Sequence, residues 1–596
     1  MYSSNKDRCL NYLKLLDADR MLYNFRKTYG LDTLGAKPLG GWDEPTGLLR
    51  GHSTGHYLSA LALSYASTKD EEIKKKLDYI VNELHKLQSL SGGNAKDFKT
   101  VCTPDNAAQS LWSKNPSCWG KGYLGAYPPD QFALLEQYTP YATIWAPYYT
   151  LHKILAGLID CYTYADNKTA LDTAILLGNW VNDRLNATTK EQRAKMWSMY
   201  IAGEYGGMNE SLATLSLLSH NESFLETAKM FDNPKVFDGL ALNLDTISGI
   251  HANQHIPQII GALKEYEASG DEKYFKIAAS FWKIVTDHYT YSIGGVGRGE
   301  NFKEPDILAG NIDTNRNCET CACYNMLKLT RMLYTYDPKN SSFMDYYERG
   351  LLNQIAASQN PVVTDYMHHG VTYMLPIGPG AIREYSNDYD DFTCCHGTGM
   401  ENHVKYQDSV YCLLEEEKAL YINLYIGSKI TDSVNLSMEV NHEKQQAVIT
   451  INEDCDYKLF FRVPYWADGG MEIKQNGLVV SKADRPGGYI TSQYSLKKGD
   501  ELILSFPYSV RLEVTPDLLD SSEIASVCYG PFVMTTLSDS EDWIDIYSLP
   551  NPSESFVAGW DKENDMPTLS SYGRKFIPMY AAHNVKYHTY FKLHRI

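Results

Sequence analysis

The chain has 596 residues, 43% of them apolar, and contains no uninterrupted run of about 18 apolar residues, so neither a disordered nor a membrane-spanning chain is expected. Its 73 acidic and 55 basic residues give a net charge of -18, and no block is dense in lysine and arginine, which argues against a nucleic acid partner. At roughly 100 to 200 residues per domain, this length predicts two to four domains.

The amino-terminal residues contain neither a basic segment followed by an apolar one nor a small-residue cleavage site. No secretory signal is therefore expected, and the predicted location is cytoplasmic.

The first two thirds of the chain repeat one pattern, in which an apolar helix closes on a short polar turn and an amphipathic helix follows. In the first pair, Ile73, Leu77 and Ile80 recur at the spacing of one helical face. The expected pairs are 56–66 with 73–84, 149–165 with 171–185, 212–219 with 224–231, 256–268 with 274–288, and 324–336 with 343–355, and a further helix is expected near Asn402. Such pairs predict an α/α toroid over residues 1–415, because each pair buries its apolar faces against its neighbours. The alternative is an open helical solenoid, but the long irregular segments between pairs favour a closed ring whose loops form a site.

The period changes after about residue 416. Short β-branched and aromatic runs follow at 419–425, 447–451, 457–463 and 502–506, and Asn476-Gly477 is a strong hairpin signal. These runs predict a β-sandwich domain over 416–510. A strand-like stretch at 524–533 predicts a second, smaller β-rich domain over 511–596, and the abrupt end of the sequence suggests that this domain is incomplete.

Two groups of cysteines stand out, Cys318, Cys321 and Cys323 at the start of a helix and Cys394-Cys395 in an expected loop before the last helix. In a reducing compartment such clustering favours metal binding or catalysis over disulfides. Thiolates suit Zn²⁺, which takes four tetrahedral ligands from cysteine, histidine or carboxylate. Glu319 and Cys321 lie two apart and Cys394 and Cys395 are adjacent, so neither pair has the C-x₂-C spacing of a zinc knuckle. Two alternatives therefore stay open: packed free thiols, or a strained vicinal disulfide at 394–395.

Other polar residues occur at the ends of helices or in loops. His52, His56, His152 and His251 each suit a buried core position singly, but in a toroid the corresponding ends of the repeat helices converge. The glycine-rich segment 294–300 lacks the strand and the Lys-Ser/Thr of a phosphate loop, and is more typical of a loop that presents Glu300. The 45 tyrosines and 10 tryptophans suit clefts that stack on sugars, which makes a carbohydrate the favoured partner.

An ordered set of motifs between residues 49 and 402 carries a resemblance to known proteins that covers about residues 40 to 535. It comprises LRGH at 49–52 with TGHYLSA at 54–60, LHKI at 151–154, GGMNE at 206–210, HAN at 251–253, GENF at 299–302, ETC at 319–321, and CC at 394–395 followed by GTGMEN at 397–402. Together these motifs resemble the β-L-arabinofuranosidases of glycoside hydrolase families 127 and 146, and the amino-terminal motifs look closer to family 146.

This resemblance implies an (α/α)6 barrel followed by β-sandwich domains, and retaining hydrolysis of terminal β-L-arabinofuranosides with a cysteine nucleophile. The implied site residues are the Zn²⁺ ligands Glu319, Cys321, Cys394 and Cys395, the nucleophile Cys394, the acid/base Glu300, and the sugar-binding residues His152, His251, Tyr373, His52 and His56. The stretch from Glu300 to Glu319 is longer than the family pattern, so Glu304 is the alternative acid.

Two other functions remain open at this stage. One is an α/α-toroid glycosidase that acts on another sugar with a carboxylate pair such as Asp306 and Glu300. The other is a non-catalytic carbohydrate-binding protein with a structural zinc. The sequence indicates neither a membrane nor a nucleic acid partner, and it leaves open whether the chain forms a homo-oligomer.

Overall fold

The structure, a computed structural model, describes residues 1–492 and 496–596. Within these residues the α-helices are α1 (Tyr2–Leu15), α2 (Ala18–Thr28), α3 (His52–Thr68), α4 (Glu71–Gln88), α5 (Asp130–Glu136), α6 (Pro147–Ala165), α7 (Lys168–Asn186), α8 (Lys190–Trp197), α9 (Met208–Ser219), α10 (Glu222–Ala228), α11 (Pro234–Leu240), α12 (Ala252–Ser269), α13 (Glu272–His288), α14 (Thr320–Tyr336), α15 (Ser342–Gly350) and α16 (Cys394–Asn402). No helix in this part of the chain is both long enough and apolar enough to cross a membrane.

The strands all follow the last helix. They are β1 (Tyr411–Leu414), β2 (Ala419–Ile422), β3 (Ser428–Thr431), β4 (Asn435–Asn441), β5 (Gln446–Ile451), β6 (Lys458–Arg462), β7 (Met471–Gln475), β8 (Leu478–Ala483), β9 (Tyr489–Thr491), β10 (Glu501–Ser505), β11 (Val510–Leu519), β12 (Ser522–Tyr529), β13 (Phe532–Leu537), β14 (Asp545–Ser548), β15 (Val557–Asp561), β16 (Met566–Ser571), β17 (Arg574–Pro578), β18 (Tyr587–His588) and β19 (Tyr590–Arg595).

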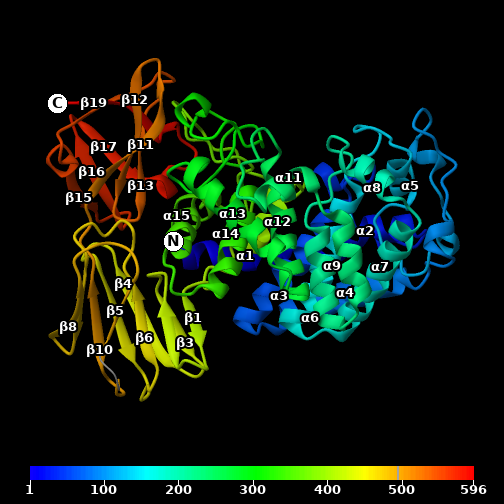
Figure 1. The fold of residues 1–596 in the computed structure, drawn as a ribbon, viewed down its shortest axis with the longest axis horizontal. Helices are drawn as coiled ribbons and strands as arrows, with labels where there is room; N and C mark the ends of the chain where they lie inside the picture. Colours follow the sequence, from blue (N-terminus) through cyan, green and yellow to red (C-terminus); the bar gives the residue numbers. More distant parts are fainter. Residues whose placement is uncertain (493–495) are drawn as a thin grey trace. The chain divides into compact units, whose positions relative to one another are not determined.

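The chain divides into two compact units. The first comprises residues 1–284, 359–373 and 385–405, and the second comprises 285–358, 374–384 and 406–596. The first unit therefore holds α1 to α12, most of α13, and α16. The second holds α14, α15 and the strands (Figure 1).

The helices of the first unit are arranged in successive antiparallel pairs, as predicted. Helix α16 contacts α3, α3 contacts α6, α6 contacts α9, and α9 contacts α12, while α4, α7 and α10 pair with α3, α6 and α9. Each turn between partners has the same construction, a left-handed residue that ends one helix followed by an Asp or Asn that caps the next. Lys69 (φ 53°) precedes Asp70, and Asp166 (φ 51°) precedes Asn167. This turn ends one helix and starts its partner within two residues, so the pairs are antiparallel.

Glycines allow the closest approach between two of these helices. A Cβ atom on Gly55 of α3 would lie 2.2 Å from the carbonyl oxygen of Lys153 in α6, and one on Gly157 would lie 2.5 Å from the carbonyl oxygen of Gly55. Because no other residue fits at either position, this crossing fixes the ends of α3 and α6 that carry His52, His56 and His152.

The last helix begins earlier than predicted. The sequence predicts a loop at 392–397 and a helix near Asn402, whereas α16 begins at Cys394 and ends at Asn402. Thr393 starts the helix, since its hydroxyl oxygen accepts a hydrogen bond from the backbone N–H of His396 at 3.4 Å. Both adjacent cysteines therefore lie in the first turn of a helix.

Two neighbouring acids, Glu265 and Asp232, lie in the first unit. Glu265 in α12 is fully buried, and the half-buried Asp232 accepts a hydrogen bond from the Tyr274 hydroxyl at 2.8 Å. Burial raises the pKa of Asp232 to about 6 and, together with the charge of Asp232, raises the pKa of Glu265 well above its ordinary value. Both shifts favour the protonated form of the pair in the folded chain.

Replacement of Glu265 by glutamine is expected to stabilise the protein at alkaline pH. Both folded pKa values lie above the unfolded values near 4, so the contribution of the pair is complete below about pH 4 and is lost as the pH rises through the folded values. The gain at pH 8 should be on the order of 1 to 3 kcal/mol, with little change at pH 4. Thermal unfolding at both pH values measures it, with Glu267→Gln on the exposed side of α12 as control. A lower melting temperature for Glu265→Gln at pH 8 would contradict the raised pKa values of the pair.

The strands of the second unit form three sheets. Their orders are β1-β2-β6-β9, β3-β4-β5-β10-β7-β8, and β14-β19-β12-β13-β17-β16-β15 with β11 beside β12. Strand β5 alternates half-buried and buried residues, which gives it one core-facing side. The hairpin predicted at Asn476-Gly477 is confirmed: it joins β7 to β8, and both residues have positive φ, 48° and 87°.

Candidate metal centre and active site

Helix α14 presents two candidate ligands at its amino terminus. Glu319 is the residue before the helix and Cys321 lies in its first turn, and both are buried. The segment before the helix is fixed on both sides, since Cys318 accepts hydrogen bonds at its carbonyl oxygen from the Leu375 N–H at 3.1 Å and from Gln354 Nε2 at 2.8 Å. The partial positive charge of a helix amino terminus favours the ionised forms of these two side chains.

Helix α16 presents Cys394 and Cys395 in the same way. Both thiols are buried and lie at a helix amino terminus, where thiolates are favoured. Their sulfur atoms are 3.9 Å apart, so the residues do not form a vicinal disulfide. No disulfide joins any of the twelve cysteines in the part of the chain that the structure describes.

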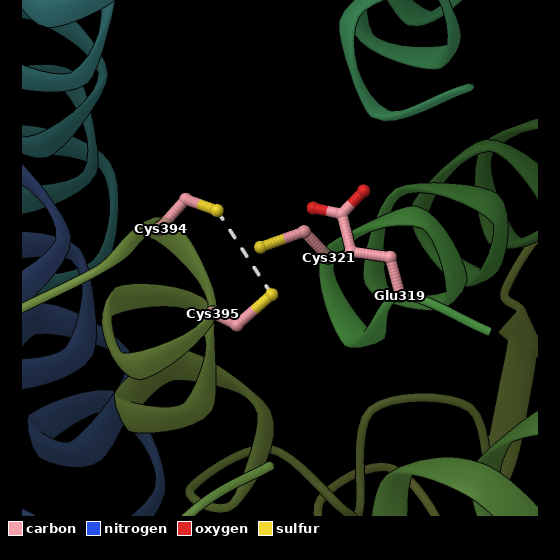
Figure 2. Close-up of side chains that lie close together, drawn as sticks. All are labelled: Glu319, Cys321, Cys394 and Cys395. Carbon is pink, nitrogen blue, oxygen red and sulfur yellow. Dashed lines mark hydrogen bonds between the residues drawn. The ribbon is translucent and has the colours of Figure 1, made fainter. Parts of the chain in front are cut away.

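The ligand atoms of Glu319, Cys321, Cys394 and Cys395 all lie within 4.8 Å of one another (Figure 2). The three sulfur atoms point toward one another, and the Glu319 carboxylate lies on the side of the cluster where Cys321 lies. For a zinc–sulfur bond of about 2.3 Å, two sulfurs of a tetrahedral site are about 3.8 Å apart, and the Cys394–Cys395 distance is close to this value. The residues therefore fit a tetrahedral metal ion, and this cluster can hold one.

Neither of the other nearby cysteines belongs to this cluster. Cys323, two residues after Cys321, is fully buried, and its sulfur lies 3.9 Å from the carbonyl oxygen of Gly350. Burial raises the pKa of the Cys318 and Cys323 thiols well above their ordinary value, so both behave as neutral core residues.

Glu300 lies in a tight turn with an unusual backbone. Arg298 and Asn301 exchange two backbone hydrogen bonds, and the residues between them, Gly299 and Glu300, have φ of 55° and 68°. A left-handed conformation is unfavourable for a glutamate, and such strain is concentrated at functional sites. The ligand atoms of Glu300, His251 and Glu319 lie within 4.8 Å of one another, whereas Glu304 is exposed.

Each of the four predicted histidines has a hydrogen-bond partner on one ring nitrogen. His251 Nδ1 lies 3.0 Å from Glu204, His152 Nδ1 lies 2.8 Å from the Ser211 hydroxyl, and His56 Nδ1 lies 2.6 Å from Glu401. His52 Nε2 is 3.0 Å from the carbonyl oxygen of Phe392 and 3.1 Å from Asp43. Burial lowers the pKa of His56 to about 4, so this ring is neutral at pH 7 and donates its Nδ1–H to Glu401.

One aromatic side chain contacts the nucleophile candidate, and two tryptophans continue from it. The Tyr373 hydroxyl lies 3.5 Å from the Cys394 sulfur, and the ring of Trp42 is 6.2 Å from the ring of Tyr373 and 4.9 Å from that of Trp145. Tyr373 was predicted from the sequence, but neither tryptophan was. The surplus of aromatic residues was the only signal for them, and it does not indicate which ones pack against Tyr373.

The family model of the GH127 β-L-arabinofuranosidase catalytic domain matches residues 1–408, and that of the GH127 middle domain matches residues 419–508. The chain therefore belongs to the GH127 β-L-arabinofuranosidase family and is a glycosidase.

Solved structures agree in fold. A GH127 β-L-arabinofuranosidase from Geobacillus stearothermophilus T6 is 14% identical, with a TM-score of 0.70 over 100% of this chain and 99% of that one. Another GH127 β-arabinofuranosidase is 16% identical, with a TM-score of 0.73 over 99% of this chain and 95% of that one. A search of curated proteins found no match. These likenesses confirm the predicted fold class, a helical catalytic domain followed by β-rich domains.

Proposed function

We propose that the protein releases terminal β-L-arabinofuranose from plant glycans or other arabinofuranosides with retention of configuration. Cys394 is the nucleophile, Glu300 is the acid/base, and Glu319, Cys321, Cys394 and Cys395 bind zinc. The observation that carries the proposal is the cluster of three thiols and one carboxylate within 4.8 Å, with Glu300 in reach of Glu319. The amino-terminal motifs further suggest kinship with family 146.

The chain supplies both groups that a retaining glycosidase needs. In the first step the Cys394 thiolate attacks the anomeric carbon while the Glu300 carboxyl protonates the leaving oxygen. In the second step the Glu300 carboxylate takes a proton from water, which displaces the sulfur and restores the thiolate. When bound, zinc would keep the thiols deprotonated at neutral pH.

The remaining predicted residues bind or stack on the sugar of the substrate. Tyr373 is close enough to the Cys394 sulfur to contact the sugar ring that this atom attacks. Trp42 and Trp145 offer faces for stacking beside it. His152 and His251 bind the substrate. His52 and His56 contribute to substrate binding by fixing the start of α3.

The test of function is a panel of pentofuranosides and pentopyranosides with one aglycone. Release of arabinose from the β-L-furanoside alone supports the proposal. Preferential hydrolysis of another sugar, insensitive to Cys394→Ser, would instead support a carboxylate pair such as Asp306 with Glu300. Asp306 lies 3.0 Å from His288 on an exposed part of the loop, which disfavours that alternative.

Purified protein is expected to contain one equivalent of zinc per chain, because the four ligands complete a tetrahedral set. Cys321→Ala should lose most of this zinc, and Cys323→Ala, on the same helix but outside the cluster, should keep it. Elemental analysis of both variants decides the point. Zinc well below one equivalent in active wild-type protein would remove the metal from the mechanism.

We also propose a reducing, cytoplasmic location, because no disulfide joins the cysteines in the residues that the structure describes. The division into domains at 1–415, 416–510 and 511–596 remains our proposal. It is supported by strand grouping, since the sheet from β3 to β10 lies within 428–505 and the sheet from β11 to β19 within 510–595, although β1 already begins at Tyr411.

A further inference from the structure

A β-bulge in the carboxyl-terminal region directs one side chain away from its sheet. Strands β11 and β12 pair antiparallel, and their register shifts between Val514 and Leu518. The Thr515 hydroxyl lies within hydrogen-bond distance of the carbonyl oxygens of Asp517, at 2.9 Å, and Ile524, at 3.2 Å, which stabilises the bulge. Bulges commonly re-aim a side chain. Here the side chain is that of Asp517.

The Asp517 carboxylate binds the loop that carries Glu300. Its Oδ1 accepts hydrogen bonds from the backbone N–H groups of Leu308, at 2.8 Å, and Ala309, at 2.7 Å, and its Oδ2 accepts one from Gly310, at 2.9 Å. Charge-assisted bonds of this kind are about twice as strong as neutral ones. Both oxygens are used, so the loop is fixed in orientation as well as in position.

Hydrogen bonds connect this anchor to the turn of Glu300. The carbonyl oxygen of Asn311, next after the anchored residues, accepts from Asn317 Nδ2 at 2.9 Å. Further along the loop, Asp313 forms an ion pair with Arg298 at 2.9 Å, and the Gly299 N–H donates to the carbonyl oxygen of Arg316 at 2.7 Å. Arg298 and Gly299 directly precede Glu300. The segment that follows the residues bound by Asp517 therefore holds the turn that carries Glu300.

A second residue of the same region holds the start of the loop. The Tyr590 hydroxyl in β19 accepts a hydrogen bond from the Ser292 N–H at 2.8 Å, and the Tyr590 side chain is buried. Both contacts come from residues beyond 508, where the match to the middle-domain model ends. The carboxyl-terminal β-rich region therefore touches the loop at two places.

We propose that Asp517 is a positioning residue for Glu300. The inference rests on the proposed acid/base role of Glu300. The turn at Glu300 has a strained left-handed backbone, which persists only while its surroundings hold it. Without the three bonds to Asp517, the loop relaxes and the carboxyl group of Glu300 moves away from the leaving oxygen, although Glu300 itself is unchanged.

The test compares kcat/KM of Asp517→Asn and Asp517→Ala on two substrates, a nitrophenyl β-L-arabinofuranoside and a natural disaccharide. Nitrophenol needs little protonation, so its release should fall by less than about 3-fold, while hydrolysis of the disaccharide should fall by about 10 to 100-fold. Loss of folded protein alone would lower both values equally. Circular dichroism and zinc content normalise the rates to folded enzyme.

Glu513→Gln is the matched control, because Glu513 lies on the same strand but pairs with Arg349, at 2.8 Å, instead of the loop. It should leave the ratio of the two substrates unchanged. A double variant, Asp517→Asn with Glu300→Gln, should show no larger substrate difference than Glu300→Gln alone, since the first residue acts through the second.

The outcomes separate this inference from the proposed function. If Glu300→Gln discriminates between the substrates and Asp517→Asn does not, the positioning role is overturned and the acid role stands. If Glu513→Gln produces the same difference in kcat/KM between the two substrates, the effect comes from how the whole carboxyl-terminal β-rich region is held. The specific role of Asp517 is then overturned as well. If wild-type enzyme is active but Glu300→Gln affects both substrates alike, both proposals fail.

Discussion

Replacement of Cys394 by serine is expected to lower kcat/KM by about 10⁴-fold or more, the effect typical of removing a nucleophile. A hydroxyl at this position is a weak nucleophile without a neighbouring base, and it is a poor ligand for zinc. Steady-state kinetics on the nitrophenyl arabinofuranoside measures the loss. Because that substrate has a good leaving group, acid assistance does not limit its hydrolysis, and the loss reports on the thiolate at position 394.

A covalent probe separates the two adjacent cysteines. An arabinofuranose analogue with a haloacetamide at the anomeric position should label Cys394, and mass spectrometry locates the adduct. Cys323→Ser is the control, since this buried thiol lies outside the metal-binding cluster. Activity in Cys394→Ser close to that of wild type, or an adduct found only on Cys395 or a carboxylate, would remove Cys394 from the reaction.

The paired helices could be predicted because their signals are local. Apolar residues recur at the helical period, and the Asp and Asn residues that begin the second helices cap them through their own side chains. The hairpin at Asn476-Gly477 is equally local, since both positions need positive φ.

Helix α16 could not be predicted in the same way. Its sequence, CCHGTGMEN, contains two glycines and has low helix propensity, yet all nine residues are buried in the structure. Tertiary packing and the cap at Thr393 therefore determine where this helix begins. The sequence predicted a loop there because propensity was the only information available.

The candidate metal cluster depends on contacts between distant residues. Spacing alone left packed thiols and a vicinal disulfide open, and the ligand set Glu319, Cys321, Cys394 and Cys395 came from resemblance to a family. Asp517 lay outside any prediction, because its role depends on a bulge and on backbone groups more than 200 positions away. Such contacts leave no periodic signal in the sequence.

Replacement of Glu300 by glutamine is expected to lower kcat/KM for a natural disaccharide by about 10² to 10⁴-fold, the value of general acid assistance. The amide keeps the size of the side chain but cannot supply a proton to the leaving oxygen. A nitrophenyl arabinofuranoside needs little protonation, so its kcat/KM should fall much less. Its kcat should still fall, because the second step needs the Glu300 carboxylate as a base to activate water.

Glu304→Gln is the matched control for this prediction. Glu304 lies in the same loop and carries the same group, but its side chain is exposed, whereas Glu300 lies within reach of His251 and Glu319. The strained turn gives a second reason to expect the role at Glu300, since a glutamate is held at φ 68° only where the surroundings compensate for the cost. Equal losses on both substrates in Glu300→Gln, or the substrate difference appearing in Glu304→Gln instead, would assign the proton transfer to another group. An external nucleophile such as azide should restore turnover of the nitrophenyl substrate in Glu300→Gln, because it reacts in the second step without needing a base.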